Sequence, residues 1–271
     1  MRRSSAASML PLLLIPVIAL AAAGLLYTVL KKSSADDAVV KETVSRLKAM
    51  EEADVSEVEA AISVAEELPL ARVLEPSERK DLEERIVNGY VLDDVSIRQA
   101  FRDTAILGDS ITESIWEYGY LDQDVVISKM GLSVANADEQ FATAISMAPS
   151  VIFMNFGSND LEFYEENYEQ FIDAYREQIH KVKEALPNAR LFINLIIPLT
   201  EGAIEEIPVL ANYPRYNEAL KALCEEEGMT WIDDSFIVEA DPSLYEPDGQ
   251  HVVMSFYPQW LTYMAEVAGL V

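Results

Sequence analysis

The chain has 271 residues, of which 50% are hydrophobic and 25% charged, and its formal net charge is −27. This length and apolar content allow a buried core and exclude a wholly disordered chain. The acidic balance argues against nucleic acid as a partner, because phosphate binding needs clustered Lys and Arg. The single cysteine, Cys224, excludes an intramolecular disulfide, and the lack of a Cys/His cluster argues against structural zinc.

The first 34 residues differ sharply from the rest. Residues 4–30 contain no charged side chain, and two basic residues lie on each side of this mostly apolar run. About 20 apolar residues span the hydrocarbon core of a bilayer, so residues 1–34 are predicted to be an N-terminal transmembrane anchor. Because the flanking charges are balanced, the expected extracytoplasmic location of the remaining chain rests on the N-terminal position of the anchor.

A cleaved signal peptide is the alternative interpretation of this segment. Residues 21–23 are alanines that would suit a cleavage site, but the chain stays apolar beyond them, which favours an uncleaved anchor. After residue 34 the chain has 16 basic and 47 acidic residues, a net charge of −31. This charge is expected to keep the domain off an anionic lipid surface.

Residues 35–100 are expected to form a helical stalk or linker without chemistry of its own. Apolar residues recur every three or four positions up to residue 65, which is typical of an amphipathic helix. Ser77 predicts the start of a short helix that Asn88 and Gly89 would end. The segment either lifts the following domain off the membrane or packs on that domain. A dimerising coiled coil is disfavoured because the repeat is short and interrupted, and the oligomeric state is left open.

Residues 101–271 show a different pattern, in which short apolar runs alternate with amphipathic helices. The runs are 104–107, 124–130, 150–156, 189–199 and 230–234. This alternation predicts a parallel sheet covered by helices on both faces. Ligands bind outside the carboxyl ends of the strands in such a fold, so the chemistry is expected directly after the apolar runs.

Four short motifs carry the candidate site. Gly108, Asp109 and Ser110 lie in ILGDSIT, Gly131 in KMGLS, Gly157, Asn159 and Asp160 in FGSND, and Asp248 and His251 in DGQH. In this order the motifs resemble the SGNH or GDSL hydrolase superfamily, with Ile111 in place of the usual leucine. The resemblance covers the domain at 101–271 and implies an α/β fold of three α/β/α layers with a five-stranded parallel sheet.

The residue types fit nucleophilic catalysis of acyl transfer. A serine hydroxyl such as that of Ser110 needs an adjacent base, and His251 is one of only two histidines. Asp248, three residues earlier, is suited to hold the imidazole tautomer and to stabilise the imidazolium. The resemblance assigns the oxyanion hole to the backbone N–H groups of Ser110 and Gly131 and to the side-chain amide of Asn159.

Four further residues are expected to support the turns rather than to react. Asp109 and Asp160 are short acids of the kind that bond nearby backbone, and Gly108 and Gly157 complete the same two turns. The triad would supply its own nucleophile, base and electrophilic donors, so no cofactor and no metal are expected.

These expectations describe a membrane-anchored serine esterase. Its partners would be a small-molecule or polysaccharide ester and the membrane, and the favoured substrate is an O-acetyl group on cell-envelope or extracellular carbohydrate. The first alternative is an acyltransferase that passes the acetyl group to a sugar hydroxyl. The second is a catalytically silent binding domain, which is disfavoured because every catalytic position of the family is filled.

Overall fold

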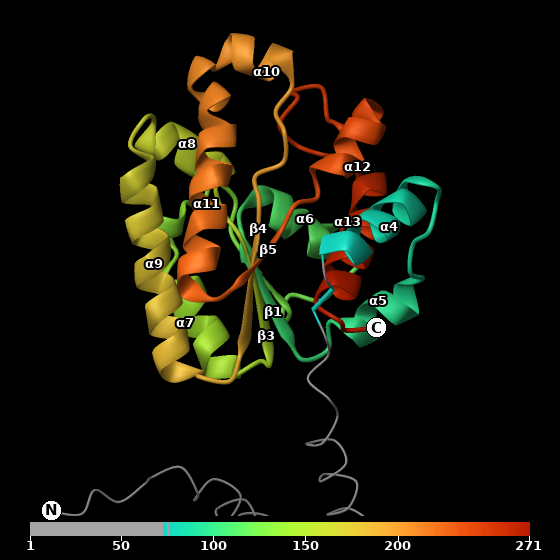
Figure 1. Cartoon of the computed structure of the whole chain (residues 1–271), viewed down its shortest axis with the longest axis vertical. Coiled ribbons are helices and arrows are strands. Elements are labelled where there is room, and N and C mark those ends of the chain that lie inside the picture. The colour runs from blue at the N-terminus through green and yellow to red at the C-terminus, as the bar shows by residue number, and fades with distance from the viewer. Residues whose placement is uncertain (1–72, 75) are drawn as a thin grey trace, which may run out of the picture. The chain divides into compact units, whose positions relative to one another are not determined.

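The computed structural model describes residues 73, 74 and 76–271 of the chain (Figure 1). The predicted anchor at 1–34 and most of the predicted stalk at 35–100 lie outside these residues. Across the described part of the chain, no helix is both long enough and apolar enough to cross a membrane.

Five parallel strands form one sheet, as predicted. They are β1 (Thr104–Gly108), β2 (Val126–Ser128), β3 (Val151–Asn155), β4 (Arg190–Asn194) and β5 (Thr230–Ile232). The strand order is β2-β1-β3-β4-β5, and each strand coincides with one of the predicted apolar runs. Because the strands are parallel, their carboxyl ends meet at one edge of the sheet, where the motif residues follow them.

Helices cover both faces of the sheet and complete three layers (Figure 1). One layer contains α7 (Asp138–Met147), α8 (Ser158–Tyr164), α9 (Tyr168–Ala185), α10 (Glu201–Glu206) and α11 (Tyr213–Glu227). The other contains α6 (Ser110–Glu117), α12 (Ser235–Ala240) and α13 (Tyr257–Val267), with α4 (Pro76–Val87) and α5 (Asp94–Ala100) packed on α12 and α13. Short 3-10 helices at η1 (Val134–Asn136), η2 (Pro208–Asn212), η3 (Pro242–Leu244) and η4 (Met254–Phe256) complete the connections.

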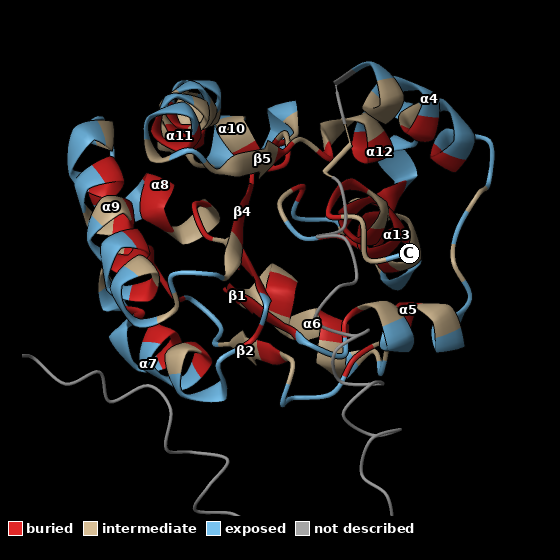
Figure 2. Cartoon of the chain, turned by 60° about the horizontal axis from the view of Figure 1, so that its bottom comes forward, coloured by how far each residue is buried: buried red, intermediate tan, exposed pale blue. Residues whose placement is uncertain are grey.

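The core lies on both sides of the sheet because successive strand residues face opposite layers. Ile152 belongs to the cluster on the α7–α11 side, whereas Phe153 belongs to the cluster on the α6–α13 side. The rings of Phe153 and Phe192 stack with centroids 5.2 Å apart. The central strands β1, β3 and β4 are accordingly buried, the edge strands β2 and β5 are only partly buried, and the helices turn their buried faces to the sheet (Figure 2).

The described part of the predicted stalk packs on the domain. Leu82 and Ile86 of α4 and Ile97 of α5 are at most 2% exposed and belong to the same core cluster as α13. The predicted boundary at residue 100 therefore does not coincide with a break in packing. Of the two arrangements left open for residues 35–100, packing on the domain holds for residues 76–100.

Candidate active site

Ser110 stands at the sharp turn between β1 and α6. Asp109 caps α6, since its Oδ1 accepts a hydrogen bond of 3.1 Å from the backbone N–H of Ile111. Gly108 is required for close packing there, because a Cβ atom at this position would lie 2.1 Å from Thr112 Oγ1. As the first residue of α6, Ser110 has no intrahelical acceptor for its own backbone N–H.

Asp248 and His251 lie together on a short loop before η4. An isolated antiparallel bridge between Tyr245 and Val252 closes the base of this loop, and the N–H of Glu246 donates to the carbonyl of His251 at 2.8 Å. The loop therefore presents the acid and the base as one unit.

The structure brings the predicted triad into a continuous hydrogen-bonded chain. Ser110 Oγ lies 3.0 Å from His251 Nε2, and His251 Nδ1 lies 2.7 Å from Asp248 Oδ2. The side chains of His251 and Asp248 are 49% and 45% exposed, so this edge of the sheet is open to solvent.

Asp248 is held in its ionised form by hydrogen bonds. Partial burial works to raise the pKa of its carboxyl group, but the backbone N–H groups of Gln250 and His251, each at 2.9 Å, and the imidazole lower the pKa below its ordinary value. An ionised carboxylate at this position fixes the proton of the imidazole on Nδ1 and leaves Nε2 free to accept a proton from Ser110.

The three predicted oxyanion donors lie at the same edge of the sheet. Gly108 is in register with Ser128 of β2 and with Asn155 of β3, so the segments that contain Gly131 and Asn159 leave the sheet beside Ser110. Gly131 has φ +71°, which suits glycine in the turn that the Leu132 N–H closes on the Lys129 carbonyl at 3.2 Å.

Asn159 is anchored by the carboxylate of Asp109. Its Nδ2 donates to Asp109 Oδ2 at 3.1 Å, which leaves the second N–H of the same amide for another acceptor. Burial raises the pKa of Asp109 to about 6, against the opposing effects of the hydrogen bonds from Ile111 and Asn159 and of nearby His251. Through its hydrogen bonds with Ile111 and Asn159, Asp109 braces both the turn that carries Ser110 and the amide.

Asp160 braces the other side of the site. It is fully buried, and its Oδ1 accepts a hydrogen bond of 3.0 Å from the backbone N–H of Val134, three residues beyond Gly131. Burial, with repulsion from Asp109, raises the pKa of Asp160 to about 8. Gly157 precedes α8 as its N-terminal cap residue. The predicted supporting residues therefore lie where they connect the turns after β1, β2 and β3.

Three polar residues near the site, of which Asn194 and Asp234 are buried and Asn155 is partly buried, were not singled out from the sequence. Asn155 and Asn194 end β3 and β4, and Asp234 follows β5. The available signal was a polar residue inside or at the end of three of the predicted apolar runs, Asn155 in 150–156, Asn194 in 189–199 and Asp234 in 230–234.

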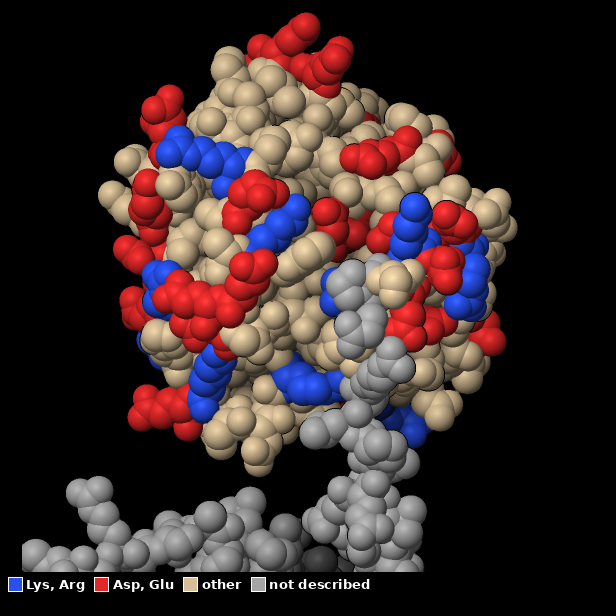
Figure 3. Space-filling model, in the orientation of Figure 1, with Lys and Arg blue, Asp and Glu red and all other residues tan. Residues whose placement is uncertain are grey.

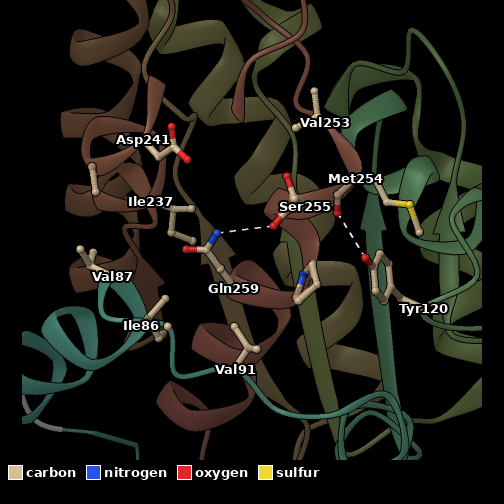
Figure 4. Close-up of a pocket in the computed structure, with 13 residues that line it drawn as sticks. Ile86, Val87, Val91, Tyr120, Ile237, Asp241, Val253, Met254, Ser255 and Gln259 are labelled. Atoms are coloured by element: carbon tan, nitrogen blue, oxygen red, sulfur yellow. Dashed lines mark hydrogen bonds between the residues drawn. The ribbon is translucent and has the colours of Figure 1, made fainter. Parts of the chain in front are cut away.

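A pocket of about 780 Å³ lies among α4, α12 and the start of α13 (Figure 4). Val87, Val91 and Met254 contribute to its apolar walls, and Tyr120 donates a hydrogen bond of 3.3 Å to the Met254 carbonyl. None of the predicted site residues lines this pocket.

Among the residues that the structure describes, no three His, Cys, Asp or Glu side chains are grouped so as to hold a metal ion.

The fold and the hydrogen-bonded Ser–His–Asp chain define a class of serine hydrolase. The chain belongs to the GDSL-like lipase/acylhydrolase family, whose model matches residues 106–253. It is an SGNH-type enzyme that hydrolyses carboxylic esters. This match confirms the family resemblance that the four motifs indicated.

Two solved structures illustrate the similarity. A GDSL-like lipase from Bacteroides thetaiotaomicron is 12% identical, with 72% of this chain and 98% of that chain covered and a TM-score of 0.49. A catalytic mutant of an acetylxylan esterase from Geobacillus stearothermophilus is 15% identical, with 62% and 93% covered and a TM-score of 0.45. No curated protein sequence matches the chain.

Proposed function

We propose that the chain is a membrane-anchored serine esterase in which Ser110, His251 and Asp248 form the catalytic triad. The observation that carries this proposal is the continuous chain of contacts of 3.0 Å from Ser110 Oγ to His251 Nε2 and 2.7 Å from His251 Nδ1 to Asp248. Such a chain supplies the adjacent base that a serine nucleophile needs.

The reaction proceeds through an acyl-enzyme. Ser110 Oγ attacks the ester carbonyl carbon while His251 Nε2 takes the hydroxyl proton. The tetrahedral intermediate collapses, the bond to the alcohol oxygen breaks, and the alcohol leaves with the proton from His251. A water molecule then attacks the acyl-enzyme with His251 again as base, and the carboxylic acid leaves as Ser110 is reprotonated.

The oxyanion of each tetrahedral intermediate would be bound by three donors. These are the backbone N–H groups of Ser110 and Gly131 and the amide N–H of Asn159 that Asp109 leaves free. Donors fixed before the substrate binds need no reorganisation as the charge develops, which favours the transition state over the ground state.

The favoured substrate is an O-acetyl group on cell-envelope or extracellular carbohydrate. The half-exposed side chains of His251 and Asp248 support this proposal, since an open site admits an ester on a bulky polymer. The apolar run at residues 4–30 supports an anchor that would place the domain next to such a polymer. Exposed Met130, next in sequence to Gly131, offers an apolar contact for the substrate.

The nucleophile is tested with the full chain in detergent. Ser110→Ala should abolish both hydrolysis of a small aryl acetate and labelling by a fluorophosphonate, because Ser110 Oγ is the only hydroxyl of the described residues that is hydrogen-bonded to the His251 imidazole. Ser146→Ala, which removes an exposed hydroxyl of α7, serves as the matched control. Turnover or labelling retained by Ser110→Ala would refute the assignment of the nucleophile.

The substrate class is tested with acetylated oligosaccharides and a series of acyl chain lengths. Release of free acetate, with a preference for acetylated glycans over long-chain esters, is the expected result. If the labelled acetyl group instead appears on an added oligosaccharide and no free acetate is released, the chain is an acyltransferase that acts on a sugar hydroxyl and not an esterase.

A further inference from the structure

A polar layer lies beneath the nucleophile turn, at the carboxyl ends of three neighbouring strands. Asn155 ends β3, Asn194 ends β4, and Asp234 comes two residues after β5. By the two-residue period of a strand, Asn155 and Asn194 face the same side as the core residues Phe153 and Phe192, which is the side covered by α6 and α13.

These polar residues surround a small cavity of about 30 Å³. Asp109, Thr112, Phe256 and Trp260 also line it. Five buried polar atoms of the lining lack a hydrogen-bond partner, namely Asn155 Oδ1, Asn194 Oδ1, Asn194 Nδ2, Asp234 Oδ1 and Trp260 Nε1. Half of the ten such side-chain atoms among the described residues thus gather around this one cavity.

We propose that this cavity is a structural water site that holds one or two water molecules. A cavity needs roughly 10–15 Å³ to hold a water molecule, which in turn needs two to four polar partners. The lining offers both kinds of partner, because Trp260 Nε1 is a donor and Asp234 Oδ1 an acceptor. Asn194 adds one donor and one acceptor whichever way its amide is turned.

Water suits this lining better than an ion does. The two N–H donors of Trp260 and Asn194 oppose a cation, and the carboxyl group of Asp234 opposes an anion. Asp234 is 1% exposed, and burial together with nearby Asp233 raises its pKa well above the ordinary value, against the opposing effect of the Trp260 indole N–H, which lies close to the carboxyl group without forming a well-aligned hydrogen bond. A water molecule both donates and accepts, so it pairs with Asp234 in either protonation state.

The site also lies directly against the nucleophile turn. Asn155 Nδ2 donates to Thr112 Oγ1 at 3.3 Å, and Thr112 belongs to the first turn of α6, two residues after Ser110. The same amide therefore contacts α6 through its nitrogen and the cavity through its oxygen, so bound water connects α6 to the ends of β4 and β5.

The substitution Asn194→Leu distinguishes a hydrated cavity from a dry one, because it should change Tm in opposite directions in the two cases. In a dry cavity, leucine replaces two unpartnered polar atoms, and Tm rises. In a hydrated cavity, leucine displaces water and leaves the other polar atoms unpaired, and Tm falls by at least about 4 °C. We expect the fall in Tm, together with the loss of one or two long-lived internal waters in ¹⁷O relaxation dispersion of the full chain in detergent.

Asn88→Leu, the same replacement at an exposed position, is the matched control and should leave the internal water count unchanged. Should Asn194→Leu not fold, Trp260→Phe tests the same site, since it removes a single donor while it keeps an aromatic ring. A raised Tm with an unchanged water count in the variant that folds would overturn the proposal. The outcome does not depend on the esterase activity.

Discussion

The carboxylate of Asp109 holds Asn159 in place before any substrate binds. One N–H of the amide is committed to Asp109, so the rotation of the amide is restricted and its other N–H has a fixed direction. A donor whose orientation is set in advance stabilises the developing oxyanion without an entropic cost at the moment of reaction.

Asn159→Ala should therefore reduce kcat strongly. Loss of one oxyanion donor typically lowers kcat by about 10²–10³-fold, and KM for a small aryl acetate should change little. Glu162→Ala, at an exposed position of the same helix, should leave both constants unchanged. A fall in kcat of less than about 10-fold would exclude Asn159 as an oxyanion donor.

Asp160 makes stability depend on pH in a defined direction. Its folded-state pKa of about 8 lies above that of an unfolded aspartate, so its contribution is fully present below about pH 4 and is lost as pH rises through 8. A single group of this kind contributes at most about 1.4 kcal/mol per pH unit.

Asp160→Asn should flatten this dependence, because the amide resembles the protonated acid and does not ionise. Between pH 6 and pH 8.5 the wild-type free energy of unfolding, measured with urea, should fall by about 1–3 kcal/mol more than that of the variant. Asp124→Asn, at an exposed acid, should follow the wild type. Parallel curves for wild type and Asp160→Asn would contradict the raised pKa.

At the level of elements, α4 and α5 belong to the folded domain although the family match begins at residue 106. Ile97 of α5 is fully buried in the core cluster that also contains α13, whereas Val95 of the same helix is 74% exposed. Arg79 of α4 further donates a hydrogen bond of 2.9 Å to the Trp231 carbonyl of the edge strand β5.

Two substitutions in α5 test this packing. Ile97→Ala should lower the free energy of unfolding by about 2–5 kcal/mol, since it leaves a cavity in the core. Val95→Ala truncates an apolar side chain that is exposed to solvent, and it should change the free energy of unfolding by no more than about 0.5 kcal/mol. Chemical denaturation measures both, and equal effects would show that α5 does not belong to the cooperative unit.

The sequence predicted the elements whose signal is local. Each strand is a short apolar run between turn residues, and Ser110 lies where the first run meets a helix, as the motif implied. The packing partner of α4 could not be predicted, because an amphipathic pattern shows that a face is buried without showing against what. The inward direction of Asn194 and Asp234 depends on strand register and on the position of α13, which no short window contains.

At the scale of the whole molecule, the strong negative charge is expected to affect which esters approach the site. The net charge is −27, and Figure 3 shows acidic side chains spread over the visible face with fewer lysines and arginines between them. The net charge already counts every Lys and Arg, including those paired with acidic side chains, as Lys183 is with Glu227 at 2.7 Å. An anionic substrate therefore meets a repulsive potential.

This field predicts a salt effect that depends on substrate charge. When ionic strength rises from about 10 mM to about 150 mM, kcat/KM for an anionic aryl ester should rise about 2–10-fold relative to a neutral analogue, because salt screens the repulsion. The neutral ester serves as the internal control. The same salt response for both esters would exclude a role for long-range charge.

The bridge between Tyr245 and Val252 ties the two ends of the loop that carries Asp248 and His251. Motion of this hairpin as a unit would lengthen the serine–imidazole separation while it preserved the imidazole–carboxylate pair. Low concentrations of denaturant should accordingly abolish esterase activity before the downfield signal of the imidazole Nδ1 proton disappears from the NMR spectrum. Inactivation would then precede the loss of that resonance. The inactivation would be reversed when the hairpin returned to its position beside Ser110.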